Sequence, residues 1–408
     1  MNASALWLRL VPAYATGYYL SYALRNVNAV ISPDLVSEFG LSESHLGLLT
    51  SIYFLAFGLF QLPLGVLLDR YGPRRVEVAL LLIAAAGCAV FGVAQHLGTL
   101  VAGRALIGLG VSACLMGSFK AFAQWFPAER LPSLNATIMV AGGLGMLSVS
   151  APLAWALPLL GWRGVFGVVC ALLTLSALAI WFTPDGPLPK SVSMREQIKG
   201  LIGIYKHPTF WRFAPQGCVV AGGAMAVQGL WMVPWLMQVD GLSRDAAAHV
   251  ALLVSAAMLS GFLLVATASP WLAQRGWPPM RLLQSGVALG LVAELCVITH
   301  SLPGALVWSL FGLAFSLTNI AYSQLTKAFD PSLGGRVNTA LNLVVFMGAF
   351  GLQWGLGAGL QQLIALGWSQ VQAFHVSLAV LLLMQTLAFA WFMWPQSKPA
   401  LASKPEVQ

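Results

Sequence analysis

The sequence predicts an all-α integral membrane protein with 12 transmembrane helices in two pseudo-symmetric bundles of six. Only 8% of the 408 residues are charged and 58% are hydrophobic, whereas about 25% of residues in a soluble protein are charged. Long apolar runs recur along the chain, and one polar stretch divides them into two equal sets. These observations exclude a soluble enzyme, a nucleic-acid-binding protein and a disordered protein. The runs also lack the polar–apolar alternation of a transmembrane β-barrel.

A membrane-spanning helix needs about 20 mostly apolar residues. The segments that meet this requirement are 9–33, 43–68, 76–97, 99–126, 133–157, 162–183, 210–237, 246–268, 281–299, 303–328, 337–362 and 372–395. The first follows Arg9 without an evident cleavage site, so we expect no cleavable signal peptide. We expect an N-terminal bundle over 1–183, a cytoplasmic linker over 184–209, a C-terminal bundle over 210–395 and a cytoplasmic tail over 396–408.

The loop charges predict the orientation. Sixteen of the 21 Lys and Arg residues fall in loops on one side, and only Arg104, Arg163 and Arg244 fall on the other. Cytoplasmic loops of membrane proteins carry the excess of Lys and Arg. We therefore expect both termini to be cytoplasmic and the protein to lie in the cell inner membrane.

The two halves are similar to each other at nearly one offset. The matches are Gly-Leu-Ser at 40–42 and 241–243, Gly72 and Gly276, and Gly145 and Gly348. Their order predicts a duplicated six-helix unit. Because each unit has six helices, the second copy inserts in the same orientation as the first, which is typical of one transporter architecture.

One loop resembles a family signature. The sequence Gly65-Val-Leu-Leu-Asp69-Arg70-Tyr-Gly72-Pro-Arg74-Arg75 is similar to the G-x-x-x-D-R-x-G-R-R loop of the major facilitator superfamily, with Pro73 as a departure. Arg104 begins a segment that resembles the family's R-x-x-x-G-x-G element. The resemblance implies alternating access, with Asp69 as a latch against the other half. The residues to which it assigns gating or conformational roles are Gly65, Asp69, Arg70, Gly72, Arg74, Arg75 and Arg104.

The end of the first span resembles organic anion:cation symporters and organophosphate antiporters. Their D-R-x-N element corresponds here to Leu24-Arg25-Asn26-Val-Asn28, so Leu24 replaces the acid. This replacement removes the proton-coupling role that the acid would imply.

Arg25 is the main candidate for substrate binding. A cation at mid-membrane costs at least about 2.5–3.5 kcal/mol on insertion scales and normally faces a cavity. Helical spacing places other polar or aromatic residues on its face, namely Tyr18, Ser21, Tyr22 and Asn28. A guanidinium can bind a carboxylate or phosphate through two hydrogen bonds. Alternatively, Arg25 extends to the headgroups or pairs with Glu38 or Asp34.

Other intramembrane polar groups extend this hypothesis. Lys120 either lines the cavity as a second cation or extends to the cytoplasmic headgroups. Glu294 is the only carboxylate that we expect deep inside a span, and it is either the proton-coupling group or a neutral structural acid. In the second half, four neutral side chains either bind ligand hydroxyl groups or join helices. They are Gln228, Trp231, Asn319 and Asn342.

The sequence therefore predicts a secondary active transporter for a small organic anion, such as a carboxylate, coupled to H⁺ and acting as a monomer in contact with membrane lipid. The alternatives are an efflux antiporter for drugs or amphipathic metabolites and, more remotely, a non-transporting membrane sensor. Five isolated cysteines offer no metal-ligand spacing. We expect no enzyme activity, catalytic residue, cofactor, metal or nucleic-acid partner. Substrate identity and direction of transport stay open.

Overall fold

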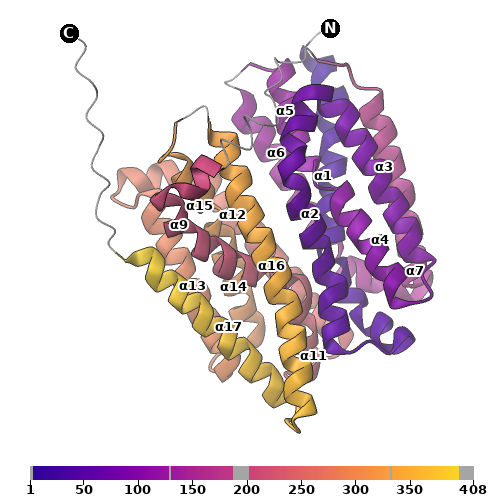
Figure 1. Ribbon diagram of the computed structural model, residues 1–408, viewed down its shortest axis with the longest axis vertical. Coiled ribbons are helices and arrows are strands. Elements are labelled where there is room, and N and C mark those ends of the chain that lie inside the picture. Colours follow the sequence, from indigo (N-terminus) through magenta and orange to yellow (C-terminus); the bar gives the residue numbers. More distant parts are fainter. Residues whose placement is uncertain (1–2, 128–129, 187–201, 331–332, 395–408) are drawn as a thin grey trace.

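The computed structural model describes residues 3–127, 130–186, 202–330 and 333–394, and their regular structure is helical. The helices form two bundles that lie side by side, the first from the N-terminal half and the second from the C-terminal half (Figure 1). We call the end that carries the 70–75 loop the Arg70 end, and the opposite one the Arg244 end. The bundles touch near the Arg244 end and diverge toward the Arg70 end (Figure 1).

The first bundle follows the predicted spans closely. Its helices are α1 (Ala3–Phe39), α2 (Glu43–Tyr71), α3 (Pro73–Gly92), α4 (Leu97–Gly110), α5 (Cys114–Trp125), α6 (Leu131–Ser148) and α7 (Ala151–Trp181). Helices α4 and α5 together form one membrane-spanning stretch, Leu97–Trp125. Helix α7 contains a sharp kink at Gly161, where φ is 63°, so its first part continues α6 and its second part is the next predicted span.

The second bundle includes a span with two π-helical segments. Its elements are α9 (Pro208–Pro215), η2 (Gln216–Ala221), α10 (Gly222–Ala226), η3 (Val227–Trp231), α11 (Met232–Gln238), α12 (Arg244–Gln274), α13 (Pro279–Thr299), α14 (Gly304–Thr318), α15 (Ile320–Thr326), α16 (Gly334–Ala365) and α17 (Gln370–Met393). Gln353 of α16 supports the π-helical span. Its Nε2 donates to the Ala226 carbonyl, and its own carbonyl accepts from Trp231 Nε1 at 3.0 Å.

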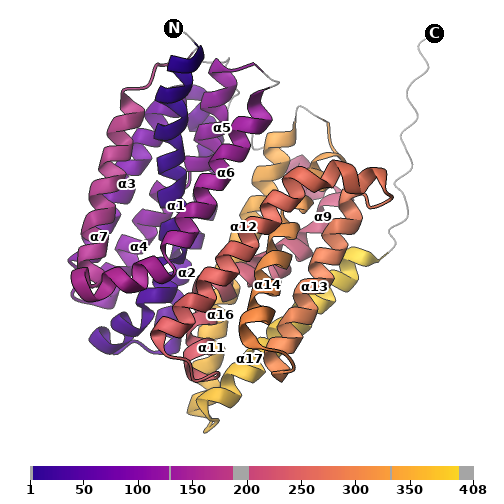
Figure 2. The same ribbon diagram turned by 180° about the vertical axis from the view of Figure 1, so that it is seen from behind.

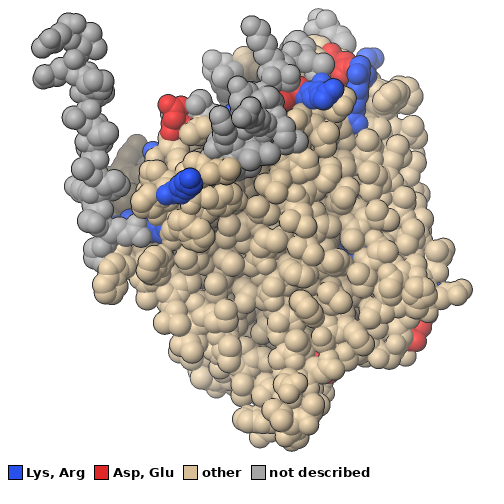
Figure 3. Space-filling view, in the orientation of Figure 1, with Lys and Arg blue, Asp and Glu red and all other residues tan. Residues whose placement is uncertain are grey.

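Within the described residues, 10 helical stretches are long and apolar enough to cross a membrane. Helix α1 is not among them, although it has 37 residues. Its tyrosines and Arg25 lower its hydropathy, as expected for a helix of the first bundle that also faces the second bundle. The space-filling view agrees with a membrane protein, because charged side chains gather at the Arg70 end above a mostly uncharged flank (Figure 3).

The predicted internal repeat has matching local geometry in both bundles. Gly40 and Gly241 both have a positive φ, as do Gly72 and Gly276. A Cβ atom at Gly145 would lie against the Tyr19 carbonyl of α1. A Cβ atom at Gly348 would lie against the Cys218 carbonyl of η2. In each bundle, therefore, the fifth span approaches the backbone of the first span through an equivalent glycine.

Helix α1 continues through a proline because a side chain compensates for it. Pro33 lacks the N–H that would bond to the Ala29 carbonyl. The Ser32 hydroxyl donates to that carbonyl at 3.1 Å instead. The helix therefore runs on to Phe39, six residues beyond the predicted end of the first span, and carries Asp34 and Glu38 at the Arg244 end.

The bounds that we predict for the two bundles, the linker and the tail stay predictions. Residues 187–201 of the predicted linker and the predicted tail 396–408 lie outside the described residues.

Candidate functional site

Arg25 lies between the two bundles, enclosed by aromatic rings. Its guanidinium carbon is 4.5 Å from the centroid of Tyr22 on α1 and 5.6 Å from that of Phe57 on α2. The third ring, Phe346 at 5.4 Å, belongs to α16 of the other bundle. Phe57 and Phe346 stack on each other with centroids 4.3 Å apart. The ring faces stabilise the cation electrostatically without consuming its N–H donors.

The acids that could pair with Arg25 have other partners. Asp34 forms an ion pair with Arg244, and Glu38 forms one with Arg163 at 2.5 Å. Within the described part of the chain, Arg25 takes part in no ion pair, and its buried Nε has no hydrogen-bond partner. The guanidinium therefore keeps its charge without a paired carboxylate among the described residues, which suits it to bind an anion. The unpartnered Nε does not by itself set Arg25 apart, because the Nε atoms of Arg104 and Arg244 also lack a partner.

Arg104 meets the same turn of α1 but uses its donors differently. It is completely buried, and its Nη1 and Nη2 atoms donate to the carbonyls of Leu24 at 2.7 Å and Arg25 at 3.3 Å. Its guanidinium also lies 4.9 Å from the Tyr53 ring centroid. Arg104 thus joins α4 to α1 and positions the backbone of Arg25.

The other two predicted residues of α1 differ in accessibility. Tyr22 is half-buried and packs edge-on against Tyr18, with centroids 5.2 Å apart. Asn28 is fully buried, and its Nδ2 donates to Thr50 Oγ1 of α2 at 3.2 Å. Tyr22 thus belongs, with Phe57 and Phe346, to the group of rings around Arg25, which we call the Arg25 cluster. Asn28 instead joins two helices of the first bundle.

Asn342 is the predicted residue of the second half that lies beside the Arg25 cluster. It stands one turn from Phe346 on α16, and its Oδ1 accepts from the Tyr322 hydroxyl at 2.8 Å. Tyr322 is close enough to Arg25 to interact with its charge. Helix α16 thus presents the Phe346 ring toward the cation, and the Tyr322–Asn342 pair that joins α15 to α16 lies beside it.

Gln228, Trp231 and Asn319 lie in three other places. Gln228 is buried against Met146, with Nε2 3.5 Å from its sulfur. Asn319 is exposed, and its Nδ2 donates to the Ser316 carbonyl at 3.4 Å. Trp231 is buried and lines a separate cavity. The structure therefore does not gather the predicted set of binding residues around Arg25.

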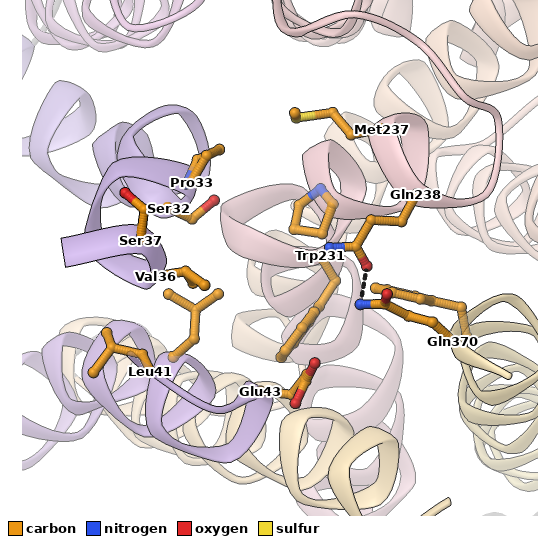
Figure 4. Close-up of a pocket in the computed structure, with 13 residues that line it drawn as sticks. Ser32, Pro33, Val36, Ser37, Leu41, Glu43, Trp231, Met237, Gln238 and Gln370 are labelled. Atoms are coloured by element: carbon orange, nitrogen blue, oxygen red, sulfur yellow. Dashed lines mark hydrogen bonds between the residues drawn. The ribbon is translucent and has the colours of Figure 1, made fainter. Parts of the chain in front are cut away.

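The cavity beside Trp231 opens near the Arg244 end and has a volume of about 310 Å³. Residues of both bundles line it, including Ser32, Ser37 and Glu43 on one side and Trp231, Gln238 and Gln370 on the other (Figure 4). Gln370 Nε2 donates to Gln238 Oε1 at 2.6 Å across its wall. Arg25 does not line this cavity, so Trp231 and Arg25 do not form one site.

Lys120 pairs with Asp69 of α2, within the first bundle. This contact places Lys120 near the Arg70 end, away from the aromatic rings that enclose Arg25. The resemblance implied that Asp69 contacts the other half. In this conformation Asp69 forms an ion pair with Lys120 of its own half, whereas the bundles diverge at this end (Figure 1).

The remaining loop residues have distinct local roles. Gly72, with φ at 80°, ends α2 and allows Pro73 to begin α3. Arg74 and Arg75 both contact Asp185, at 2.7 and 3.3 Å, and so tie the loop to the end of α7. Gly65 and Arg70 are exposed, and the Arg70 guanidinium lies 5.3 Å from the Tyr71 ring centroid.

The expectation that Glu294 is the only deeply placed carboxylate was wrong. Glu294 is 3% exposed, but Glu77 of α3 is buried completely. Helix α3 begins at Pro73, so Glu77 lies one turn inside it and faces the small residues Gly17 and Gly117. Neither carboxylate touches the rings around Arg25. Glu77 is the second residue of the predicted span 76–97, and an acid at that position was expected to reach the membrane surface.

Sequence reasoning also missed the contacts that close the Arg244 end. Arg244 of α12 donates to both carboxylate oxygens of Asp34, with Nη1 to Oδ1 at 3.2 Å, and to the Val30 carbonyl at 2.8 Å. Ser42 donates to Gln361 at 3.1 Å across the same interface. Both contacts join the two bundles. The Arg25 cluster therefore lies on the side of this closure that faces the diverging Arg70 end.

The sequence matches the family described as the Major Facilitator Superfamily over residues 14–352. It is 24% identical over 170 residues to the hexuronate transporter of Escherichia coli (strain K12), covering 42% of this chain and 39% of that one. It is 25% identical to the probable L-galactonate transporter of the same strain, covering 64% and 61%. It is 30% identical to a probable sulfoacetate transporter of Cupriavidus necator, covering 42% and 40%. The matched stretches thus span less than two thirds of these relatives' own length.

Solved structures resemble the whole chain. The D-xylose–proton symporter superposes with a TM-score of 0.77 at 16% identity, covering 95% of this chain and 97% of that one. A bacterial homologue of the human lysosomal transporter Spinster, in an inward-facing and occupied conformation, gives 0.76 at 18% identity, covering 95% and 96%. At these identities the likeness shows the fold, and it confirms the predicted arrangement of 12 helices in two bundles.

Proposed function

The chain belongs to the major facilitator superfamily, and on that premise we propose that it carries a small organic anion across the membrane by alternating access, with Arg25 as the charge that binds the anion. Family membership makes the protein a transporter rather than an enzyme. The observation that carries the proposal is the Arg25 guanidinium, which lies between the bundles with aromatic neighbours from both and without an ion pair among the described residues. A carboxylate can satisfy this cation through two parallel hydrogen bonds.

The names of the relatives support an anionic substrate. Hexuronate, galactonate and sulfoacetate are small organic anions, and two of them carry several hydroxyl groups. The Tyr322–Asn342 pair beside the Arg25 cluster offers hydroxyl and amide groups for such substituents. We therefore favour a sugar acid or a similarly short carboxylate or sulfonate.

The sequence supports an orientation in which the Arg70 end faces the cytoplasm. The excess of Lys and Arg lies in loops of this side. Since the bundles are joined at the Arg244 end, the structure then corresponds to an inward-facing state. Substrate would leave the Arg25 cluster toward the cytoplasm, and opening would require the Arg244–Asp34 pair to separate.

Coupling to H⁺ is a further part of this proposal. The anion-binding residues include no carboxylate in the described cluster, so a coupling group would act from elsewhere in the bundles. Glu294 is the candidate that the sequence offered, and Glu77 is a second one because it is equally enclosed. A lone carboxyl group in an apolar interior can exchange a proton during the transport cycle.

The test is uptake by proteoliposomes that contain the purified protein. The panel would include labelled glucuronate, galacturonate, galactonate and sulfoacetate, with galactose as the uncharged control. Each would be measured with and without an inward proton gradient. We expect saturable uptake of at least one anion and none of galactose. Uptake of galactose alone, or of none of the four anions, would contradict the proposal.

A further inference from the structure

A cavity of about 350 Å³ lies between the two bundles in the half of the molecule near the Arg70 end. Helices α6 and α12 lie side by side near the middle, where Leu259 fills the space above Gly143, and they separate toward the Arg70 end (Figure 2). The cavity occupies this separation and is closed at the back by α14 and α15. None of the residues that enclose Arg25 lines it.

One wall of the cavity is apolar and reaches the outer surface. It includes Met139 and Val140 of α6 together with Leu259, Phe262 and Leu263 of α12. Val140 is 36% exposed and Leu263 is 47% exposed. In a membrane these side chains would meet hydrocarbon, so the cavity is accessible to lipid through the gap between the two helices.

The opposite wall is polar and ends in a cation. Its side chains follow one face of α14 and α15 at helical spacing and are Ser316, Asn319, Ser323, Gln324 and Lys327. Lys327 is exposed at the Arg70 end, and no ion pair of Lys327 occurs within the described residues. From Ser316 to Lys327 the wall extends over about 16 Å at the helical rise. That length is close to half of the roughly 30 Å hydrocarbon thickness of a bilayer.

We propose that this cavity binds one anionic phospholipid from the membrane leaflet at the Arg70 end. The phosphate lies against the Lys327 ammonium group and the Gln324 amide, and an acyl chain lies along Phe262 and Leu263. A small hydrophilic anion would leave the apolar wall without a partner. A zwitterionic lipid would gain less from Lys327 because its own cation opposes the contact. The combination of both walls therefore fits an anionic amphiphile.

Lipid titration by native mass spectrometry tests the assignment. Delipidated protein would be titrated with phosphatidylglycerol, with phosphatidylcholine of the same acyl chains, and with glycerol 3-phosphate as the headgroup alone. We expect phosphatidylglycerol to bind about tenfold more tightly than phosphatidylcholine. Free glycerol 3-phosphate should not compete at similar concentrations. Equal competition would overturn the proposal in favour of a site for soluble anions, and equal binding of both lipids would overturn the role of charge.

Variants locate the lipid. Lys327→Gln should abolish the preference for phosphatidylglycerol, and Lys327→Glu should reverse it. The matched control is Arg281→Gln, which removes another exposed cation at the same end, outside the cavity. Ser323→Phe places a ring inside the cavity and should weaken the binding of both lipids. A preference that survives both Lys327 substitutions, or lipid binding unchanged by Ser323→Phe in a folded variant, would overturn the proposed position. Two independent variants at Lys327 keep the test valid if one does not fold.

Discussion

Two arginine side chains lie at one turn of α1 and differ in the partners of their guanidinium groups. Arg104 is fully buried, and two of its N–H groups donate to the carbonyls of Leu24 and Arg25. Arg25 projects from that turn between the bundles, where aromatic faces surround it and no ion pair forms among the described residues. The comparison shows that a structural cation and a binding cation differ in what surrounds them. The terminal nitrogens of the fully buried Arg104 are taken by carbonyls, so it has little left to offer a ligand. Arg25 is only half-buried, so a ligand can reach it.

The largest effect should come from removing the structural arginine. Arg104→Ala loses two charge-assisted hydrogen bonds inside the first bundle, each worth about 1.5–3 kcal/mol. We therefore expect a destabilisation of about 3–6 kcal/mol and a strong fall in the melting temperature of the purified protein. Arg104→Lys can keep one hydrogen bond, so its melting temperature should lie between those of the unchanged protein and Arg104→Ala. If Arg104→Ala had the melting temperature of the unchanged protein, the structural role of Arg104 would be refuted.

Removing Arg25 should affect transport and leave the fold intact. Truncating a buried charge that binds an opposite charge costs about 2–5 kcal/mol, so Arg25→Ala should lower uptake of the anion at least roughly 30-fold. Its melting temperature should stay close to that of the unchanged protein. Arg9→Ala is the control, because Arg9 is an exposed cation on the same helix. Normal uptake by Arg25→Ala would refute the assigned role of Arg25.

The aromatic enclosure should contribute a smaller part of the same affinity. Phe346→Leu keeps an apolar side chain but removes a ring face beside the guanidinium. Such a face is worth about 1–2 kcal/mol when the cation is desolvated. We expect KM for the anion to rise about five- to thirtyfold with little change in kcat. Phe350→Leu, one turn further along α16 and packed on Trp354, is the matched control. Equal effects of the two substitutions would mean that general packing is responsible.

A third arginine, Arg244, extends the comparison to the contact between bundles. Arg244→Gln should weaken closure of the Arg244 end by about 1 kcal/mol, or roughly fivefold in the population of the open state. A cysteine placed at the buried position Ala29, in a variant without the five native cysteines, would report the opening through its labelling rate. Arg163→Gln is the control because its ion pair with Glu38 lies within one bundle. A faster rate in both variants, or in neither, would contradict the role of Arg244 as the interbundle latch.

The smallest effect concerns pH at the same end. Burial alone would raise the pKa of the Glu38 carboxyl, but hydrogen bonds from Trp162 and Arg163 outweigh it and hold the pKa below its ordinary value of 4.5. The stabilisation is therefore complete above pH 4.5 and is lost as the pH falls through the lowered pKa. The side chains of Glu38 and Arg163 are both about 40% exposed, so their pairing stabilises the fold only slightly. The melting-temperature difference between the unchanged protein and Glu38→Gln should vanish in acid. A difference independent of pH would contradict this account.

Local properties of the chain explain why the spans could be predicted. Twenty apolar residues form a helix in a membrane because the backbone must satisfy its own hydrogen bonds there. The predicted segments accordingly match helices such as α13 (Pro279–Thr299) and α17 (Gln370–Met393) within a few residues. The boundaries missed by five or six residues are both ends of α1, where Ser32 compensates for Pro33, and the ends of α3 at Gly92 and of α12 at Gln274.

The candidate site could be predicted only in part. Arg25 was identifiable because a lone cation inside a span is rare. Its aromatic partner Phe346 was not, because nothing in the sequence relates residue 25 to a phenylalanine of the second bundle. The sequence could not show that Lys120 has a different role from Arg25, because its partner Asp69 lies 51 positions away along the chain.

The sequence by itself determined which segments are helices, where glycines turn the chain, and that few charges enter the membrane. These properties depend on residues that are neighbours along the chain. The tertiary structure alone decided how each intramembrane or end-of-helix cation is used. Arg244 meets Asp34 across 210 positions, whereas Arg25 meets three rings from both bundles. The physical reason is that a cation's partner is set by which helices pack against it, and helix packing brings together side chains that are distant in the sequence.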